Sequence, residues 1–120
     1  MDRSSGILLP VSALPGPCGI GDLGKAARDF IDFLAAAGQR HWQILPLNPP
    51  YLSASTFAGS TDLLSPEPFV ARGALTLDEV RAIDWGSDPM RVDYARVHAG
   101  RTALWDTAFA RERDAVVPAL

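Results

Sequence analysis

The stretch with the richest chemistry is a polar loop at residues 51–59. It places hydroxyl and small side chains around two aromatic rings, those of Tyr51 and Phe57. The loop follows a short apolar run, Trp42 to Leu45, that is typical of a buried strand, and Pro46 ends this run because proline lacks the N–H that a central strand donates. Two interpretations stay open: the loop lines a sugar site, or it only turns a corner.

Three glycines, Gly19, Gly21 and Gly24, have the G-x-G-x-x-G spacing of dinucleotide-binding turns. In that fingerprint the glycines lie in a tight turn directly after a strand. Here a long loop separates Gly19 from the apolar run that ends at Leu9, and no acidic residue closes the next run, His41 to Leu45. We therefore predict no nucleotide site and no cofactor.

The other reactive side chains are isolated or are predicted to lie on the surface. Cys18 is the single cysteine and has no histidine near it in the sequence, so we predict an ordinary turn residue in a reducing, cytoplasmic setting. Asp29 and Asp32 share the outer side of a predicted helix, where paired carboxylates are typical of a solvated surface. His98 falls within another predicted helix, partly buried or on its surface. The residues therefore predict no catalytic constellation and no metal site.

Charge and composition argue against several classes of protein. The net charge is −3 and the isoelectric point is near 5.2, so we expect no electrostatic binding to nucleic acid or to an anionic membrane. No run approaches the roughly 18 apolar residues of a membrane span, and the first residues lack the apolar core of a signal peptide. At 120 residues and 48% hydrophobic content, the chain has the size and composition of one ordinary domain.

The elements that must position the polar loop form a predicted βαβ unit. A short strand runs from Gly6 to Leu9, a helix from about Gly24 to Ala37, and a second strand from His41 to Leu45. Asp22 is the predicted helix cap and Gly38 the left-handed stop. The helix has one apolar stripe, made of Ala26, Phe30, Phe33, Leu34 and Ala37. A right-handed crossover then makes the two strands parallel neighbours.

The second half of the chain is predicted to be mainly helical. Asp62 to Leu64 reads as a brief strand and Pro66 to Gly73 as one or two helical turns. Thr76 and Glu79 have the spacing of a capping box that opens a short helix. A longer helix is predicted from about Val92 to Ala115. Its stripe is Tyr94, Val97, Leu104 and Ala108, and its arginines, which lie elsewhere, are Arg96, Arg101, Arg111 and Arg113.

Several segments in a fixed order resemble the N-terminus of the 4-α-glucanotransferases, also called amylomaltases or disproportionating enzymes. The resemblance is strongest through residue 47 and continues to about residue 109. The segments that carry it are Ser4 to Gly24, Phe30-Ile-Asp-Phe-Leu34, Ala37-Gly-Gln39, Trp42-Gln-Ile-Leu-Pro-Leu47, Phe57-Ala-Gly59 and Arg91-Val-Asp-Tyr94. Many fixed spacings in one order make this resemblance specific.

The resemblance implies an α/β fold, the N-terminal βα units of a (β/α)8 TIM barrel of the α-amylase clan. It implies transfer of α-1,4-glucan segments between maltooligosaccharides by a retaining mechanism, without metal or organic cofactor. In such enzymes an aspartate nucleophile and a glutamate acid/base lie about 5–5.5 Å apart. The family carries both on strands far downstream, so the resemblance places no catalytic residue in this chain.

The same resemblance names two candidate substrate contacts. Tyr51 and Ser53 match the Tyr and Ser of the family's Pro-Tyr-Gln-Ser, and a tyrosine ring can stack on a sugar while its hydroxyl hydrogen-bonds. Two departures accompany the match. Cys18 stands where the family has Tyr in Pro-Tyr-Gly-Ile-Gly, and the loop after Leu47 is shorter because it lacks the family's Gly-Tyr-Gly-Asp-Ser segment.

The length of the chain implies an incomplete barrel. A TIM barrel needs about 250 residues to close, so we expect a fragment that is inactive alone, with residues 6–47 as the first βαβ unit and 48–120 as a loop and helical segment. Uncovered strand edges are templates for pairing with another chain. The alternative function is therefore a non-catalytic binding or assembly module that pairs with a partner, or with itself, through the exposed barrel edge.

Overall fold

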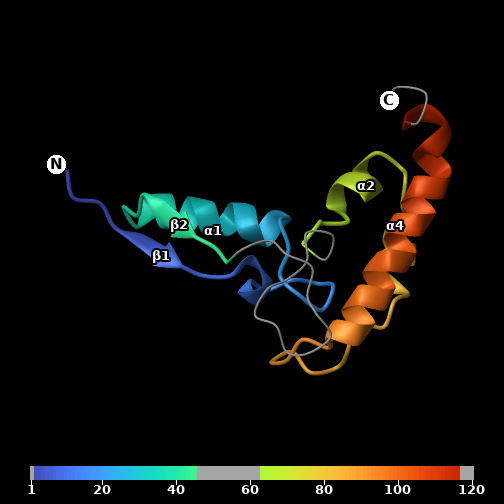
Figure 1. The fold of residues 1–120 in the computed structure, drawn as a ribbon, viewed down its shortest axis with the longest axis horizontal. Coiled ribbons are helices and arrows are strands. Elements are labelled where there is room, and N and C mark those ends of the chain that lie inside the picture. Colours follow the sequence, from blue (N-terminus) through green and yellow to red (C-terminus); the bar gives the residue numbers. More distant parts are fainter. Residues whose placement is uncertain (1, 46–62, 117–120) are drawn as a thin grey trace. The chain divides into compact units, whose positions relative to one another are not determined.

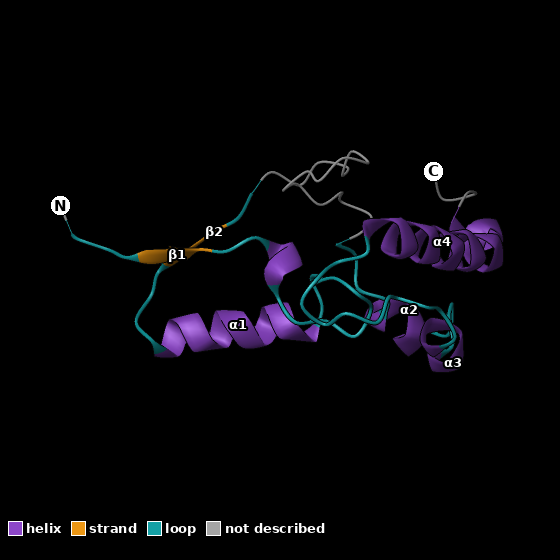
Figure 2. Ribbon diagram, turned by 90° about the horizontal axis from the view of Figure 1, so that it is seen from below, coloured by secondary structure: helices purple, strands orange, loops and turns teal. Residues whose placement is uncertain are grey.

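The structure is a computed structural model that describes residues 2–45 and 63–116 (Figures 1 and 2). The chain divides into two compact units, Met1–Leu64 and Ser65–Leu120. The first unit contains strands β1 and β2 with helix α1, and the second contains helices α2, α3 and α4. No helix among the described residues is long and apolar enough to cross a membrane.

The first unit is a βαβ unit with parallel strands. β1 spans Gly6–Leu8 and β2 spans His41–Gln43, with Ile7 opposite Trp42 in the ladder. A side chain at Gly6 would place its Cβ 2.6 Å from the carbonyl oxygen of His41, so only glycine allows the two strands to approach this closely here. The predicted βαβ unit is confirmed, with strands slightly shorter than predicted.

Helix α1 (Lys25–Ala36) connects the two strands and runs along one face of the pair (Figure 2). Asp22 does not cap the helix as predicted; Gly24 is the capping residue, and the Asp22 carboxylate instead accepts a hydrogen bond of 2.9 Å from the Gly24 N–H in the preceding turn. Gly38 follows the helix with a φ of +73°, the left-handed conformation predicted for it. The start of α1 is thus fixed by a polar turn and its end by a glycine.

The apolar stripe of α1 is only partly covered. Leu34 of the predicted stripe is buried, as is Ala27 outside it, and the ring of Phe30 packs edge-on against Trp42 with 5.1 Å between centroids. Phe33 was predicted on the buried stripe, but 64% of it is exposed. The reason is the width of the sheet, because the two strands that the structure describes do not extend over the whole stripe.

Strand β2 also differs from its predicted environment. A parallel strand is normally covered on both faces, yet His41 and Gln43 are exposed and Trp42 is half-buried. Trp42 therefore is not a fully buried core residue. α1 covers one face of the strand pair, and no described element of this unit covers the other face.

The second unit is helical, with α2 spanning Glu67–Ala71, α3 spanning Leu77–Arg81 and α4 spanning Tyr94–Val116. The predicted capping box is confirmed: the Glu79 N–H donates to the Thr76 hydroxyl at 3.2 Å and the Thr76 N–H to the Glu79 carboxylate at 2.8 Å. The brief strand predicted at 62–64 is absent at the two positions that the structure describes, Leu63 and Leu64. The buried apolar residues of this unit are Ala74, Leu75, Val80, Val97, Leu104 and Ala108.

Arg101 corrects the predicted stripe of α4. It was predicted to lie away from the apolar stripe, but it is 0% exposed and lies between Val97 and Leu104 on the buried side. Its guanidinium carbon is 5.5 Å from the centroid of the Trp85 ring, a cation–π geometry that favours a buried arginine. At the other end of the stripe, Tyr94 is 39% exposed.

Candidate functional site

The loop that leaves the carboxyl end of β1 is closely packed against itself. It holds a short 3-10 helix, Val11–Ala13, and its buried side chains are those of Val11, Leu14, Cys18, Ile20 and Asp22. The Gly21 N–H donates a hydrogen bond of 3.2 Å to the carbonyl oxygen of Ser12. A Cβ on Gly21 would lie 2.5 Å from the carbonyl oxygen of Leu14, so glycine is required for this packing. The middle glycine of the G-x-G-x-x-G pattern therefore has a role in folding the loop.

A side chain from β2 joins the exits of the two strands. The indole Nε1 of Trp42 donates a hydrogen bond of 2.8 Å to the carbonyl oxygen of Leu9, the first residue after β1. The Leu9 N–H in turn donates to the carbonyl oxygen of Gln43 at 3.0 Å. Because the strands are parallel, the loop from Pro10 and the segment after Leu45 start at the same edge of the sheet.

The two predicted substrate contacts, Tyr51 and Ser53, lie outside the described residues. Their assignment stays a prediction. The structure describes the strand that precedes them, and it fixes the edge of the sheet from which their segment begins.

The other reactive side chains have local structural surroundings. Cys18 is 2% exposed, so it is a buried turn residue and not an accessible nucleophile. Asp29 binds Lys25 at 2.5 Å on the exposed side of α1, as expected for an i, i+4 pair on a helix surface. Asp32 is exposed on the same helix, and His98 is exposed on α4. Within residues 2–45 and 63–116, no three metal-ligating side chains gather into a metal site.

The second unit has an open polar pocket of about 430 Å³ before and at the start of α4. Its carboxylates are engaged locally: Asp88 accepts from the Met90 N–H at 2.9 Å, and Asp93 accepts from the Arg96 N–H at 3.2 Å. These bonds stabilise a turn and the first turn of the helix. The pocket is lined by Gly86, Ser87, Asp88, Arg91, Val92, Asp93, Tyr94 and Arg96.

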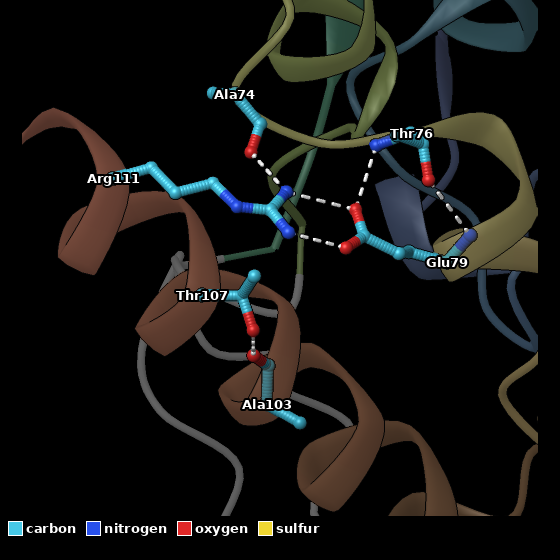
Figure 3. A network of polar contacts seen from close by, with 6 residues as sticks. All are labelled: Ala74, Thr76, Glu79, Ala103, Thr107 and Arg111. Atoms are coloured by element: carbon cyan, nitrogen blue, oxygen red, sulfur yellow. Dashed lines mark hydrogen bonds and ion pairs between the residues drawn. The ribbon is translucent and has the colours of Figure 1, made fainter.

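A charged network joins α4 to α3 (Figure 3). The Arg111 guanidinium binds both carboxylate oxygens of Glu79, at 2.5 and 3.0 Å, and donates to the carbonyl oxygen of Ala74 at 3.0 Å. The hydrogen bonds from Arg111, followed by that from the Thr76 N–H, lower the pKa of Glu79 from 4.5 to about 2. Arg72 makes a similar bidentate contact with Glu112: its Nε and Nη2 donate to the two carboxylate oxygens at 2.7 and 2.9 Å. These hydrogen bonds lower the pKa of Glu112. These pairs position helices, and they hold Glu79 and Glu112 as ion-paired carboxylates.

The family model of the 4-alpha-glucanotransferases matches residues 9–118 of the sequence. The chain belongs to this family. The 4-alpha-glucanotransferase of Streptococcus pneumoniae TIGR4 is 43% identical over an alignment of 115 positions, which covers 91% of this chain and 23% of that protein. The enzyme of Thermus thermophilus is 40% identical over 124 residues, covering 98% of this chain and 24% of that protein.

The fold agrees with this membership. A structure of amylomaltase from Streptococcus agalactiae in complex with acarbose matches the chain with a TM-score of 0.83 and 33% identity, over 91% of this chain and 23% of that one. The two parallel strands and their helices are therefore part of a glucanotransferase TIM barrel. The chain spans about a quarter of the length of the relatives that it matches.

Three features of this chain were not found from its sequence. The buried position of Arg101 was missed, although Val97, Arg101, Leu104 and Ala108 follow the i, i+4, i+7, i+11 spacing of one helix face. The contact between Arg111 and Glu79 joins residues of different helices, and no local pattern indicates it. The hydrogen bond from Trp42 to Leu9 was missed for the same reason.

Proposed function

We propose that this chain forms the first βα units of a 4-alpha-glucanotransferase barrel and one wall of its acceptor region. The complete enzyme moves α-1,4-linked glucan segments from one maltooligosaccharide to another, or to glucose. The observation that supports this most is the family match over residues 9–118. The similar proteins of Streptococcus pneumoniae and Thermus thermophilus are both named 4-alpha-glucanotransferases.

The chemistry of such a transfer requires two carboxyl groups. A retaining mechanism uses one carboxylate as nucleophile and a second carboxyl group as acid and then base, about 5–5.5 Å away. The described carboxylates Asp22, Glu79 and Asp93 accept hydrogen bonds from backbone N–H groups near them, in turns and helix starts. The reacting pair is contributed by barrel strands outside this chain, and the 120 residues alone are inactive.

The contribution of this chain is to bind and orient sugar. Barrel strands deliver their following loops to the catalytic face, and the Trp42 to Leu9 hydrogen bond joins two such loops at their base. Tyr51 stacks on a pyranose ring of the acceptor and Ser53 hydrogen-bonds one of its hydroxyls. We place the protein in the cytoplasm, since its single cysteine suits a reducing compartment.

The test is the linkage preference of a chimera in which this chain replaces the corresponding part of the Streptococcus agalactiae amylomaltase. The chimera is incubated with maltotriose, isomaltotriose or cellotriose, and both released glucose and longer products are measured. We expect glucose and longer oligosaccharides from maltotriose only. A chimera that folds, but yields no longer oligosaccharides from maltotriose, would contradict the proposed function.

A further inference from the structure

A small basic pocket lies at the amino ends of the two strands. Its volume is about 290 Å³, close to the lower end of the roughly 300–1,000 Å³ that small-molecule pockets have. Because β1 and β2 are parallel, this edge of the sheet is opposite to the edge from which the segment with Tyr51 and Ser53 begins. The residues that line the basic pocket are Arg3, Ser4, Ser5, Gly38 and Arg40.

Hydrogen bonds hold the two sides of the basic pocket together. The Arg40 N–H donates to the carbonyl oxygen of Ser5 at 3.0 Å, which extends the ladder between Gly6 and His41 by one residue. The hydroxyl of Ser4 lies 3.0 Å from Nε2 of His41. These contacts restrain the segment before β1, in a part of a chain that is poorly ordered unless it is tied down. The backbone therefore fixes the spacing between the two sides of the pocket.

The positive charge of the basic pocket is not balanced by the residues that the structure describes. In the second unit, Arg96 and Arg111 bind carboxylates. Within residues 2–45 and 63–116, the side chains of Arg3 and Arg40 form no ion pair and no hydrogen bond, and no carboxylate lines the pocket. Two guanidinium groups thus face one small opening in a protein whose net charge is −3.

The end of α1, which lies beside the basic pocket, is closed by its own backbone. Unsatisfied carbonyl groups at the end of a helix attract cations. Here the carbonyl oxygens of Leu34 and Ala35 accept hydrogen bonds from the N–H groups of Gln39 and Gly38, at 2.9 and 3.1 Å. The two arginines make no side-chain hydrogen bond to the described part of this turn, so their donors remain available to a ligand.

We infer that the basic pocket binds a phosphate group, either free or as a small phosphate monoester. A planar guanidinium matches two phosphate oxygens at once, and serine hydroxyls donate to the remaining oxygens. Arg3 and Arg40 supply the charge, and Ser4 and Ser5 supply the hydroxyl donors. The net charge of −3 disfavours a long polyanion, so the ligand is small. This inference goes beyond the proposed function and does not depend on it.

The test is calorimetric titration with inorganic phosphate and with methyl phosphate, against a chloride background of constant ionic strength. Methyl phosphate represents a monoester and has no sugar that could enter a glucan site. Both titrations are made on the 120-residue chain and on the chimera, which carries the same pocket. We expect saturable binding of one phosphate group per molecule. Tighter binding of methyl phosphate would identify the monoester as the ligand, and tighter binding of inorganic phosphate would identify the free ion. No saturable binding of either compound would overturn the inference.

Substitutions test whether the phosphate group lies in the basic pocket. Arg3→Gln and Arg40→Gln each remove one charge from an exposed side chain, and we expect each to raise the dissociation constant about tenfold. Arg40→Lys keeps the charge but loses the bidentate contact, so its effect should be intermediate. Arg81→Gln, at an exposed arginine of the other unit, is the control and should leave binding unchanged.

Equal effects of Arg3→Gln, Arg40→Gln and Arg81→Gln would overturn the inference, because binding would then follow only the net charge of the protein. Circular dichroism verifies that each variant keeps its fold. A chimera that binds phosphate but has no glucanotransferase activity supports this inference and counts against the proposed function alone.

Discussion

The indole of Trp42 and the carbonyl oxygen of Leu9 lie 2.8 Å apart, so a side chain from the second strand binds the backbone where the first strand ends. The same indole packs on Phe30, which anchors the sheet to α1. One residue therefore connects the two strand exits and the helix between them. The loops that follow these strands begin from a common, fixed base.

Trp42→Phe removes this hydrogen bond while it keeps an aromatic ring against Phe30. We expect the free energy of unfolding to fall by about 1 kcal/mol, the usual contribution of one hydrogen bond, measured from urea denaturation curves. Phe33→Leu is the control, because Phe33 is exposed and its replacement should change stability by less than about 0.5 kcal/mol. Equal stabilities of wild type and Trp42→Phe would show that the bond does not fix the strand exits.

Arg101→Ala truncates a side chain with no exposed surface beside Trp85. We expect a loss of about 2–4 kcal/mol in unfolding free energy, as for other long buried side chains cut back to alanine. Arg101→Met keeps the packed stem and should recover most of this loss. Arg96→Ala, at an exposed arginine of the same helix, should cost far less. If Arg96→Ala and Arg101→Ala were equally mild, the buried position of Arg101 would be wrong.

The Glu79 to Arg111 contact predicts a specific dependence of stability on pH. The pKa of Glu79 is lowered from 4.5 to about 2, so the ionised form stabilises the folded state above pH 4.5, and this contribution is lost as the pH falls toward 2. We expect wild type to be more stable than Glu79→Gln at pH 6 and the difference to shrink between pH 4.5 and 2, as measured by thermal unfolding. Asp106→Asn, on the exposed side of α4, is the control for a general charge effect. A difference that stays constant over this range would contradict the contact.

Tyr51→Ala tests the proposed sugar contact in the chimera. Loss of the ring should raise KM for the acceptor about tenfold, a change of about 1.4 kcal/mol, and Tyr51→Phe should retain much of the affinity because it keeps the stacking face. Ser53→Ala should have a smaller effect of the same kind. If the KM for the acceptor were the same in Tyr51→Ala as in the unmodified chimera, Tyr51 would not contact the sugar.

Local sequence patterns predicted the connectivity of the fold well. The order strand, helix, strand followed from the apolar runs that begin at Gly6 and His41, and the capping box at Thr76 followed from one spacing. Such features depend on residues close in sequence. The predicted family was confirmed, because the family model matches residues 9–118.

Burial could not be predicted in the same way, because it depends on segments far apart in the sequence or outside the chain. Phe33 and Trp42 have the pattern of core residues, but the strands and helices that would cover them are not among the described residues. Arginine is a charged residue that normally lies on the surface, but the long aliphatic part of the Arg101 side chain can pack in the buried position that it occupies. Tyr51 and Ser53 stay predictions, since they lie outside the part of the chain that the structure describes.

The most direct measurement is glucose release from maltotriose by three samples. They are the 120-residue chain, the chimera in which it replaces the corresponding part of the Streptococcus agalactiae amylomaltase, and that amylomaltase without the replaced part. We expect activity in the chimera and none in the other two samples. Activity in the 120-residue chain by itself would contradict this expectation, because carboxylates assigned here to turns, helix starts and ion pairs would then carry the chemistry.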